Sequence, residues 1–160
     1  MRRFVPWILA LTTAAAAPRV HSARAHPDFS GAWTLDVSKS EGPMVPTSAT
    51  LKVTQTEKSM VVERTTTAMG MTRTANNTYA LDGSPSKNTV NANGTSVDFN
   101  STAEWNENVL VIKTTADFGG NAFAGTERYS LSDDKKTLTI ASEASIGGQS
   151  VAGKQTFVKQ

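Results

Sequence analysis

Hydrophobic and polar residues alternate with a period of two along most of the chain from Phe29 onward, and a helical period is almost absent. Runs of strand length, rich in Thr, Val, Phe, Tyr and Ile, are separated by clusters of Gly, Asn and Asp. This alternation indicates β-strands with one buried and one exposed face. The pattern predicts ten strands, near residues 29–36, 48–56, 59–67, 70–81, 86–92, 95–105, 108–118, 121–131, 136–146 and 149–159.

The connections between most of these strands leave only a few residues for a turn, as at Asn93-Gly94 and Gly119-Gly120. Such short turns join neighbouring antiparallel strands, so the predicted topology is up-and-down. The turn positions also bring apolar faces together across each hairpin, and a one-residue slip would turn a whole set toward water. The expected opposite pairs are Val53 with Val62, Val90 with Val97, Ala103 with Leu110, Trp105 with Asn108, Tyr129 with Leu138, and Leu138 with Phe157.

The other face of these strands is polar, as in the run Asp98, Asn100, Thr102 and Glu104. A polar outer face argues against an outer-membrane barrel, whose outside must be apolar, and no membrane insertion is expected. Ten antiparallel strands with one solvated face are long enough to curl and close, which removes exposed edges. The predicted fold is therefore all-β, a single up-and-down antiparallel barrel of about ten strands. The alternative is a β-sandwich of two five-stranded sheets.

Successive turns of an up-and-down barrel lie at alternate ends, which here differ in composition: one end is rich in glycine and the other in charge. Every second residue of a strand faces the interior of the barrel, and we say that these residues have inward parity. They are large toward the charged end (Tyr79, Leu81, Trp105, Leu110, Tyr129, Leu131, Leu138 and Phe157). They are small toward the glycine-rich end (Ser101, Thr114, Ala116, Gly125, Ser142, Ala144 and Gly153). The small set predicts either unfilled space with the loop 37–47 as a flap, or a barrel that collapses to fill it.

The first 25 residues have the pattern of a cleaved secretory signal. Arg2 and Arg3 precede the mostly apolar run 4–17, and Ala23-Arg24-Ala25 matches a signal cleavage site. The sequence therefore predicts export to the periplasm or the outside of a bacterial cell, with cleavage before His26. The remaining 135 of the 160 residues suit one domain, 26–160.

Cleavage would change the net charge of the chain, and the residues that remain exclude several kinds of catalytic and metal site. The chain has 16 Lys and Arg against 14 Asp and Glu, but four of the basic residues precede His26, which leaves 12 against 14, a net charge of −2. No basic surface for nucleic acid is expected. The chain has no Cys and, after cleavage, a single His. Disulfides, a Ser-His-Asp triad and a two-histidine metal site are thereby excluded, and neither a metal nor a cofactor is expected.

Phe29, Gly31 and Trp33 open the first strand with a motif that resembles the G-x-W of lipocalins and related calycin barrels. The resemblance implies a Trp packed across a closed base, a basic residue of the last strand stacked on it, and small-molecule binding inside the barrel. Lys159 has the inward parity for the stacking role. The chain departs from that family in having no helical signal after the first strand and no disulfides.

Charged residues with inward parity are the candidates for a site. Arg64 and Arg73 lie on adjacent predicted strands in the glycine-end half, and Glu127 shares their parity. Buried guanidinium groups need an anion. That anion is either Glu127, in an internal network without a ligand, or a bound carboxylate or phosphate. Tyr79 and Tyr129 would add hydroxyl groups, and Thr114 and Ser142 would line the same space.

These residues predict a monomeric, non-enzymatic binder of a small apolar or amphipathic anionic molecule. One alternative is a structural or interaction barrel with a filled interior, which would meet a partner through an outer patch such as Val109 and Val111. A third is an isomerase or cyclase with Glu127 and Tyr129 as acid and base.

Overall fold

The computed structural model describes residues 26–92 and 95–160, so the expected signal segment 1–25 and the expected Asn93-Gly94 turn lie outside the described residues. The ten predicted strands are confirmed with small changes at their ends, except that β1 continues well beyond its predicted end. They are β1 (Gly31–Glu41), β2 (Ser48–Gln55), β3 (Ser59–Ala68), β4 (Met71–Ala80), β5 (Ser86–Ala92), β6 (Thr95–Asn106), β7 (Val109–Asp117), β8 (Ala122–Leu131), β9 (Thr137–Ile146) and β10 (Gln149–Lys159).

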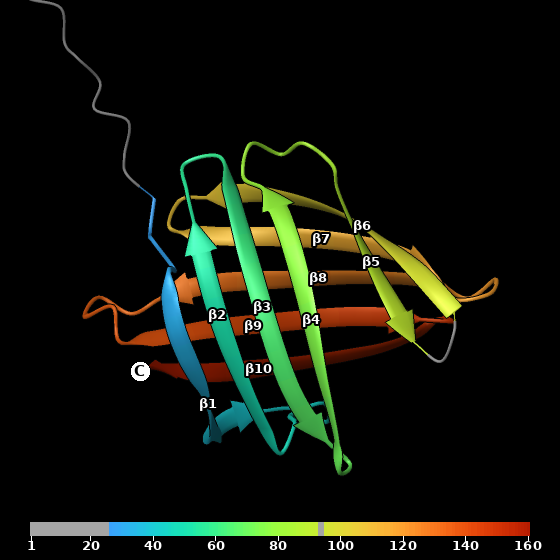
Figure 1. The fold of residues 1–160 in the computed structure, drawn as a ribbon, viewed down its shortest axis with the longest axis horizontal. Helices are drawn as coiled ribbons and strands as arrows, with labels where there is room; N and C mark the ends of the chain where they lie inside the picture. Colours follow the sequence, from blue (N-terminus) through green and yellow to red (C-terminus); the bar gives the residue numbers. More distant parts are fainter. Residues whose placement is uncertain (1–25, 93–94) are drawn as a thin grey trace, which may run out of the picture.

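All ten strands form one antiparallel sheet in the order β4-β3-β2-β1-β10-β9-β8-β7-β6-β5. Consecutive strands are neighbours, and pairing of β1 with β10 joins the two ends of the chain. Figure 1 shows the sheet curling so that β1 to β4 cross in front of β6 to β10. The up-and-down barrel is therefore confirmed, and the two-sheet sandwich is not formed.

The register follows the apolar alternation, with two corrections. Val53 lies opposite Val62, Val90 opposite Val97, and Leu138 opposite Phe157, as predicted. Trp105 instead pairs with Leu110 and Ala103 with Ile112, because the turn falls at residues 107–108. Tyr129 pairs with Ile140, because residues 132–136 form a longer loop. Both corrections shift the pairing by two residues, which leaves every side chain on its predicted face.

The large inward residues pack at the charged end, which we call the base of the barrel. Trp33 is fully buried there and its Nε1 donates to the Phe29 carbonyl at 2.9 Å. Lys159 Nζ lies 5.2 Å from the centre of the Trp33 ring, as the lipocalin resemblance implied. Tyr129, Leu110, Leu138 and Phe157 fill the same layer. Each such side chain contributes about 1.5–3 kcal/mol by leaving water, so this end supplies most of the packing.

β1 is longer than predicted, and the expected loop 37–47 is correspondingly shorter. The strand continues to Glu41, with an irregularity between Asp36 and Glu41 in its pairing with β10. Side chains replace backbone pairing in this stretch: the Thr156 amide donates to Ser40 Oγ at 3.0 Å, and Thr156 Oγ1 donates to the Lys39 carbonyl at 3.0 Å. Only residues 42–47 remain as the connection to β2.

The barrel is nearly closed, and its seam lies between β4 and β5. Among the described residues no backbone ladder joins these two strands. The buried Asn88 side chain bridges them: its Oδ1 accepts from the Thr78 amide at 2.8 Å and its Nδ2 donates to the Thr78 carbonyl at 3.1 Å. Ser86 Oγ accepts from the Ala80 amide at 2.8 Å. Two side chains thus close the seam on its base side.

Candidate functional site

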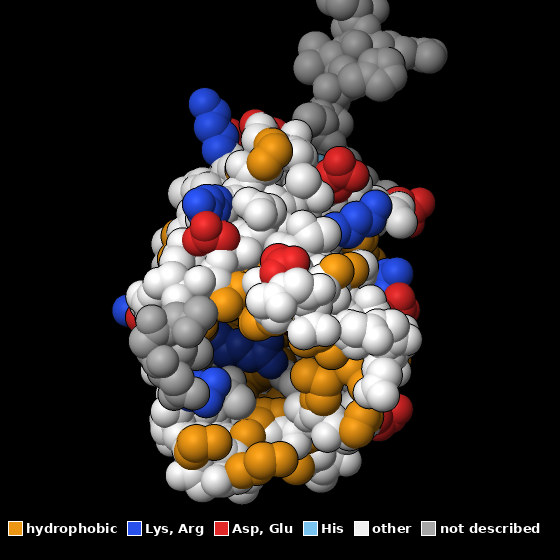
Figure 2. Space-filling model, turned by 90° about the vertical axis from the view of Figure 1, so that its right-hand side faces the viewer, with side chains coloured by type: hydrophobic (Ala, Val, Ile, Leu, Met, Phe, Trp, Pro, Cys, Tyr) orange, Lys and Arg blue, Asp and Glu red, His pale blue; other side chains and the backbone are white. Residues whose placement is uncertain are grey.

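The glycine-rich end, which we call the mouth, encloses a cavity of about 400 Å³. Small inward residues on β7 to β10 leave this space unfilled, which is the first of the two alternatives left open by the sequence. Figure 2 shows a hollow at this end, with basic side chains inside and hydrophobic side chains around it. The residues that line the cavity include Met44, Val45, Pro46, Arg64, Tyr79, Phe99, Thr114, Phe123, Gly125, Glu127, Ser142, Ala144, Gly153 and Gln155.

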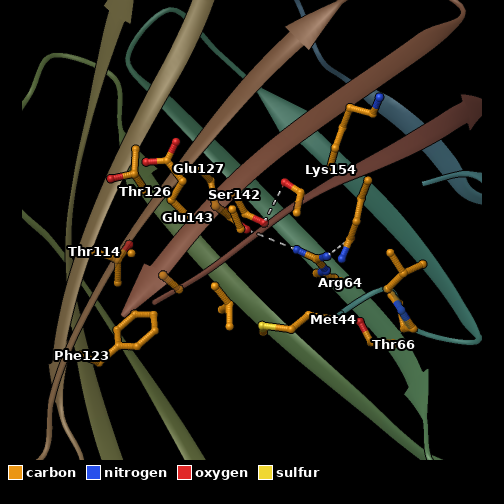
Figure 3. A pocket seen from close by; sticks show the side chains of 18 of the residues that line it. Met44, Arg64, Thr66, Thr114, Phe123, Thr126, Glu127, Ser142, Glu143 and Lys154 are labelled. Carbon is orange, nitrogen blue, oxygen red and sulfur yellow. Dashed lines mark hydrogen bonds and ion pairs between the residues drawn. The ribbon is translucent and has the colours of Figure 1, made fainter. Parts of the chain in front are cut away.

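A polar network crosses the floor of the cavity (Figure 3). Arg64, from β3, donates through Nη1 to Glu127 Oε1 of β8 at 3.5 Å and through Nη2 to Gln155 Oε1 of β10. Glu127 Oε2 accepts from the Tyr129 hydroxyl at 3.2 Å. The Arg64 and Glu127 side chains are 22% and 32% exposed, so both are held in a partly desolvated space. The ion pair at 3.5 Å is longer than an ideal charge-assisted hydrogen bond, which is about 2.7–2.9 Å.

The structure does not place Arg73 in this network, which corrects the prediction of two inward arginines. Arg73 has the expected parity and lies opposite Thr66, but its side chain is exposed and it does not line the cavity. Arg64 lies two residue pairs closer to the base, opposite Ala75. The alternation along a strand determines which face a side chain points to. Whether that side chain is enclosed depends on how far from the mouth it lies along the barrel. The inner network therefore holds one arginine and one carboxylate, without the net positive charge that two arginines would give.

Both predicted tyrosines are buried on the inner face, at different positions relative to the cavity. Tyr79 lines the cavity, whereas Tyr129 lies beneath it and reaches it through its bond to Glu127. Burial raises the pKa of both phenols, and the Glu127 carboxylate raises both pKa values further. At neutral pH the two hydroxyls are therefore hydrogen-bond donors. Tyr129 is poorly suited to act as a base on a molecule in the cavity.

Thr114 and Ser142 both line the cavity, as predicted. Thr114 Oγ1 is 2.9 Å from Ser101 Oγ, and Ser142 Oγ donates to the Gly153 carbonyl at 3.4 Å. Both hydroxyls therefore have partners within the wall. They provide short side chains that leave room, together with Gly125, where a Cβ would lie 2.9 Å from the Phe123 ring.

Several wall residues were not among the predicted site residues. Phe99 and Phe123 contribute aromatic surface, and their rings contact each other at 6.0 Å. Both have inward parity, and this feature of the sequence could have identified them as wall residues. Met44 and Pro46 come from the connection 42–47, where no periodicity gives the direction of a side chain. Gln155 has inward parity as well, but its role depends on the position of Arg64 across the barrel.

The connection 42–47 lies over one side of the mouth, where the flap was predicted. Pro46 is buried, and Gly42 packs so closely on β10 that a Cβ would lie 2.8 Å from the Ala152 carbonyl oxygen. Lys154 Nζ and Glu41 Oε1 form an ion pair at 2.7 Å beside it. These contacts hold the connection against β10 while Met44 remains 66% exposed.

Within residues 26–92 and 95–160, no group of three or more His, Asp or Glu side chains is placed to hold a metal ion. In the same ranges, no helix is long and apolar enough to cross a membrane.

Fold and site together define a class of protein, the up-and-down β-barrel with an internal cavity open at one end. Among solved structures, the zebrafish ileal bile acid-binding protein in complex with cholic acid is similar to this chain, with 15% sequence identity and a TM-score of 0.54. The likeness covers 82% of this chain and 98% of that one. No family model and no curated protein sequence matches the chain. At this identity the likeness shows the barrel fold alone.

Proposed function

We propose that this protein is an exported, monomeric, non-enzymatic binder of a small amphipathic molecule, whose acidic head group meets Arg64 and whose apolar part lies in the cavity. The observation that carries the proposal is Arg64 itself. It is a cation on the floor of a cavity of about 400 Å³, held to Glu127 by a contact of 3.5 Å. A ligand carboxylate can approach such a guanidinium more closely than Glu127 does and accept two parallel hydrogen bonds.

The wall chemistry supports an amphipathic ligand over a small polar ion. Phe99, Phe123, Val45 and Met44 give the wall of the cavity an apolar surface. Arg64 pairs with Glu127 at its floor, and Lys154 and Glu41, which also line it, pair with each other. Ligand sites commonly combine such walls with a few polar groups that fix orientation. Because Glu127 offsets the charge of Arg64, selectivity for an anion comes from hydrogen-bond geometry, and we expect a carboxylate to be preferred over the matching alcohol only modestly.

The similar solved structure supports binding in a barrel by analogy of fold, since that protein is named for binding bile acids and holds cholic acid. A cavity of about 400 Å³ does not fit the alternative of a filled, purely structural interior. The burial of Tyr129 beneath the floor does not fit the acid and base roles of an isomerase or cyclase.

The proposal is tested by comparing Arg64→Met with Arg73→Met in the binding of a fluorescent long-chain fatty acid. The two arginines lie on adjacent strands, but only Arg64 lines the cavity. A hydrogen bond to a charged group contributes about 1.5–3 kcal/mol, so Arg64→Met should weaken binding roughly tenfold or more. Arg73→Met should leave the affinity unchanged.

Two results would count against the proposal. If the unaltered protein binds neither the fatty acid probe nor its alcohol counterpart, the cavity does not hold an amphipathic ligand. If the probe binds and both variants bind it equally, the head group does not meet Arg64. Circular dichroism of both variants shows whether the barrel is intact.

A further inference from the structure

Exposed hydrophobic side chains gather at the mouth of the barrel. Of the nine large hydrophobic side chains that are exposed among the described residues, six lie on the connection 42–47, on the turns at this end or beside them: Met44, Met69, Met71, Phe118, Ile146 and Val151. We call these six residues the apolar rim. The up-and-down topology brings their segments to one end, and Figure 2 shows hydrophobic side chains around the hollow there. The other three, Val37, Val61 and Val158, are spread along the strands.

Met69 is the least expected member of the rim. It is 95% exposed, and its φ of 51° lies in the left-handed region, which disfavours a methionine. The two-residue turn Met69-Gly70 needs positive φ at both positions, where Asn-Gly is the favoured pair. At the base, Glu107 and Lys135 adopt a similar φ of 56° and 57°, and both are charged. Met69 therefore serves neither the turn nor solubility, and such a local conflict points to a function.

The rim is continuous with the wall of the cavity. Phe118 contacts Phe99 and Phe123 edge to face, at centroid distances of 5.7 Å and 6.0 Å. Phe99 and Phe123 both line the cavity, as do Met44 and Val151. An apolar path therefore leads from the outer tip of the rim to the interior.

Charges near the rim largely offset one another. Lys154 pairs with Glu41 at 2.7 Å, while Arg73, two residues from Met71, and Asp117, next to Phe118, are exposed and add one charge of each sign. A surface meant for anionic lipid or nucleic acid would carry a cluster of unopposed Lys and Arg. This balance matches an apolar or zwitterionic partner surface, which has little net charge of its own.

We propose that the apolar rim rests on the surface of a lipid bilayer of low net charge, with the Met69 turn inserted among the lipids. The docking itself is independent of the proposed function. The ligand's passage between bilayer and cavity along Phe118, Phe123 and Phe99 rests on that function. The contact is peripheral, like that of other interfacial apolar segments, and leaves the barrel outside the bilayer.

Sedimentation with phosphatidylcholine vesicles tests the docking. The variant Met69→Asn/Met71→Gln removes two exposed apolar side chains and supplies the favoured Asn-Gly turn, so its unfolding midpoint should be unchanged or higher. Each Met side chain leaves water when it enters the lipid, so its loss should lower the vesicle partition coefficient roughly tenfold or more. Val61→Thr/Val158→Thr is the matched control, because these residues are 38% and 37% exposed on the outer wall. It should bind vesicles like the unaltered protein.

Three outcomes would overturn the proposal. The first is equal vesicle binding by the Met69 variant and the unaltered protein, and the second is a lack of binding by the latter. The third is a dimer in sedimentation velocity that the Met69 variant abolishes, since the rim would then cover a second copy. All proteins are compared as one processed form, identified by intact mass, because the apolar run 4–17 could itself bind lipid. Unchanged probe binding in Arg64→Met, together with weaker vesicle binding by the Met69 variant, would overturn the head-group contact with Arg64 and support the docking, so the two proposals can fail separately.

Discussion

Tyr79 and Tyr129 are the two tyrosines of the chain, and both lie on the inner face of the barrel. Their burial removes each phenol from water, which disfavours the ionised form, and the carboxylate of Glu127 disfavours it further. In the unfolded chain both would ionise near the ordinary pKa of 10.0. The folded protein therefore binds more protons than the unfolded chain above that pH, and its stability must fall as the pH rises.

This linkage predicts an alkaline limit that the protein's own absorbance can report. The stabilising contribution of the two phenols is complete below about pH 10 and is lost progressively as the pH rises above it. The ultraviolet absorbance of phenolate should stay low in the folded protein at about one pH unit above 10, and should appear together with loss of the circular dichroism of the sheet. Titration of both tyrosines near pH 10 with the sheet intact would contradict the prediction.

The sequence predicts which side chains point into the barrel, but not how deep along the barrel each one lies. Arg64, Glu127, Thr114 and Ser142 line the cavity because each has inward parity on a strand whose limits were correctly placed. Arg73 shares that parity and is exposed, because the distance from the base of the barrel depends on shear and closure, which a single strand does not encode. The partnership of Arg64 with Gln155 likewise joins residues 91 positions apart.

At the scale of elements, the sequence locates the hairpin turns but not the seam between β4 and β5. Gly, Asn and Asp clusters mark the hairpins directly, so strand limits and faces follow from the sequence. The break between β4 and β5 has no such signal, since both strands keep ordinary alternation. The continuation of β1 to Glu41 was missed because its bonds come from Ser40 and Thr156, which are distant in sequence. Side chains that replace a backbone ladder are visible only once the neighbouring strands are known.

Asn88 should therefore matter more to stability than its place in a polar stretch suggests. Asn88→Ala removes two hydrogen bonds to the Thr78 backbone across the seam, each of which contributes about 0.5–1.5 kcal/mol. We therefore expect a lower free energy of unfolding, seen as a lower urea concentration at the midpoint of unfolding. Asn88→Asp keeps the acceptor for the Thr78 amide, loses the donor and should also destabilise the barrel. Asn100→Ala, at an exposed position on β6, is the control. Equal midpoints for Asn88→Ala and Asn100→Ala would mean that the seam does not depend on this bridge.

At the scale of the whole molecule, one end of the barrel is packed and the other is hollow. The base is filled by Trp33, Tyr129 and Phe157, whereas the mouth holds the cavity, Arg64 and the apolar rim. Residues 26–30 complete the base from outside the strands. Phe29 is fully buried, the His26 ring stacks on Trp105 at 4.3 Å, and His26 Nδ1 lies 3.3 Å from the Glu107 carbonyl oxygen.

This closure leads to a prediction about processing. Cleavage between Ala25 and His26 would retain every residue that seals the base, whereas a cut a few residues later would remove Phe29 and expose Trp33. When the protein is expressed in a bacterial host with a working secretory pathway, the exported form should begin at His26. Its formal charge should be −2 instead of the +2 of the whole chain, because four arginines are lost. Intact mass and isoelectric focusing together test this. A basic exported protein, or one that begins after Phe29, would contradict it.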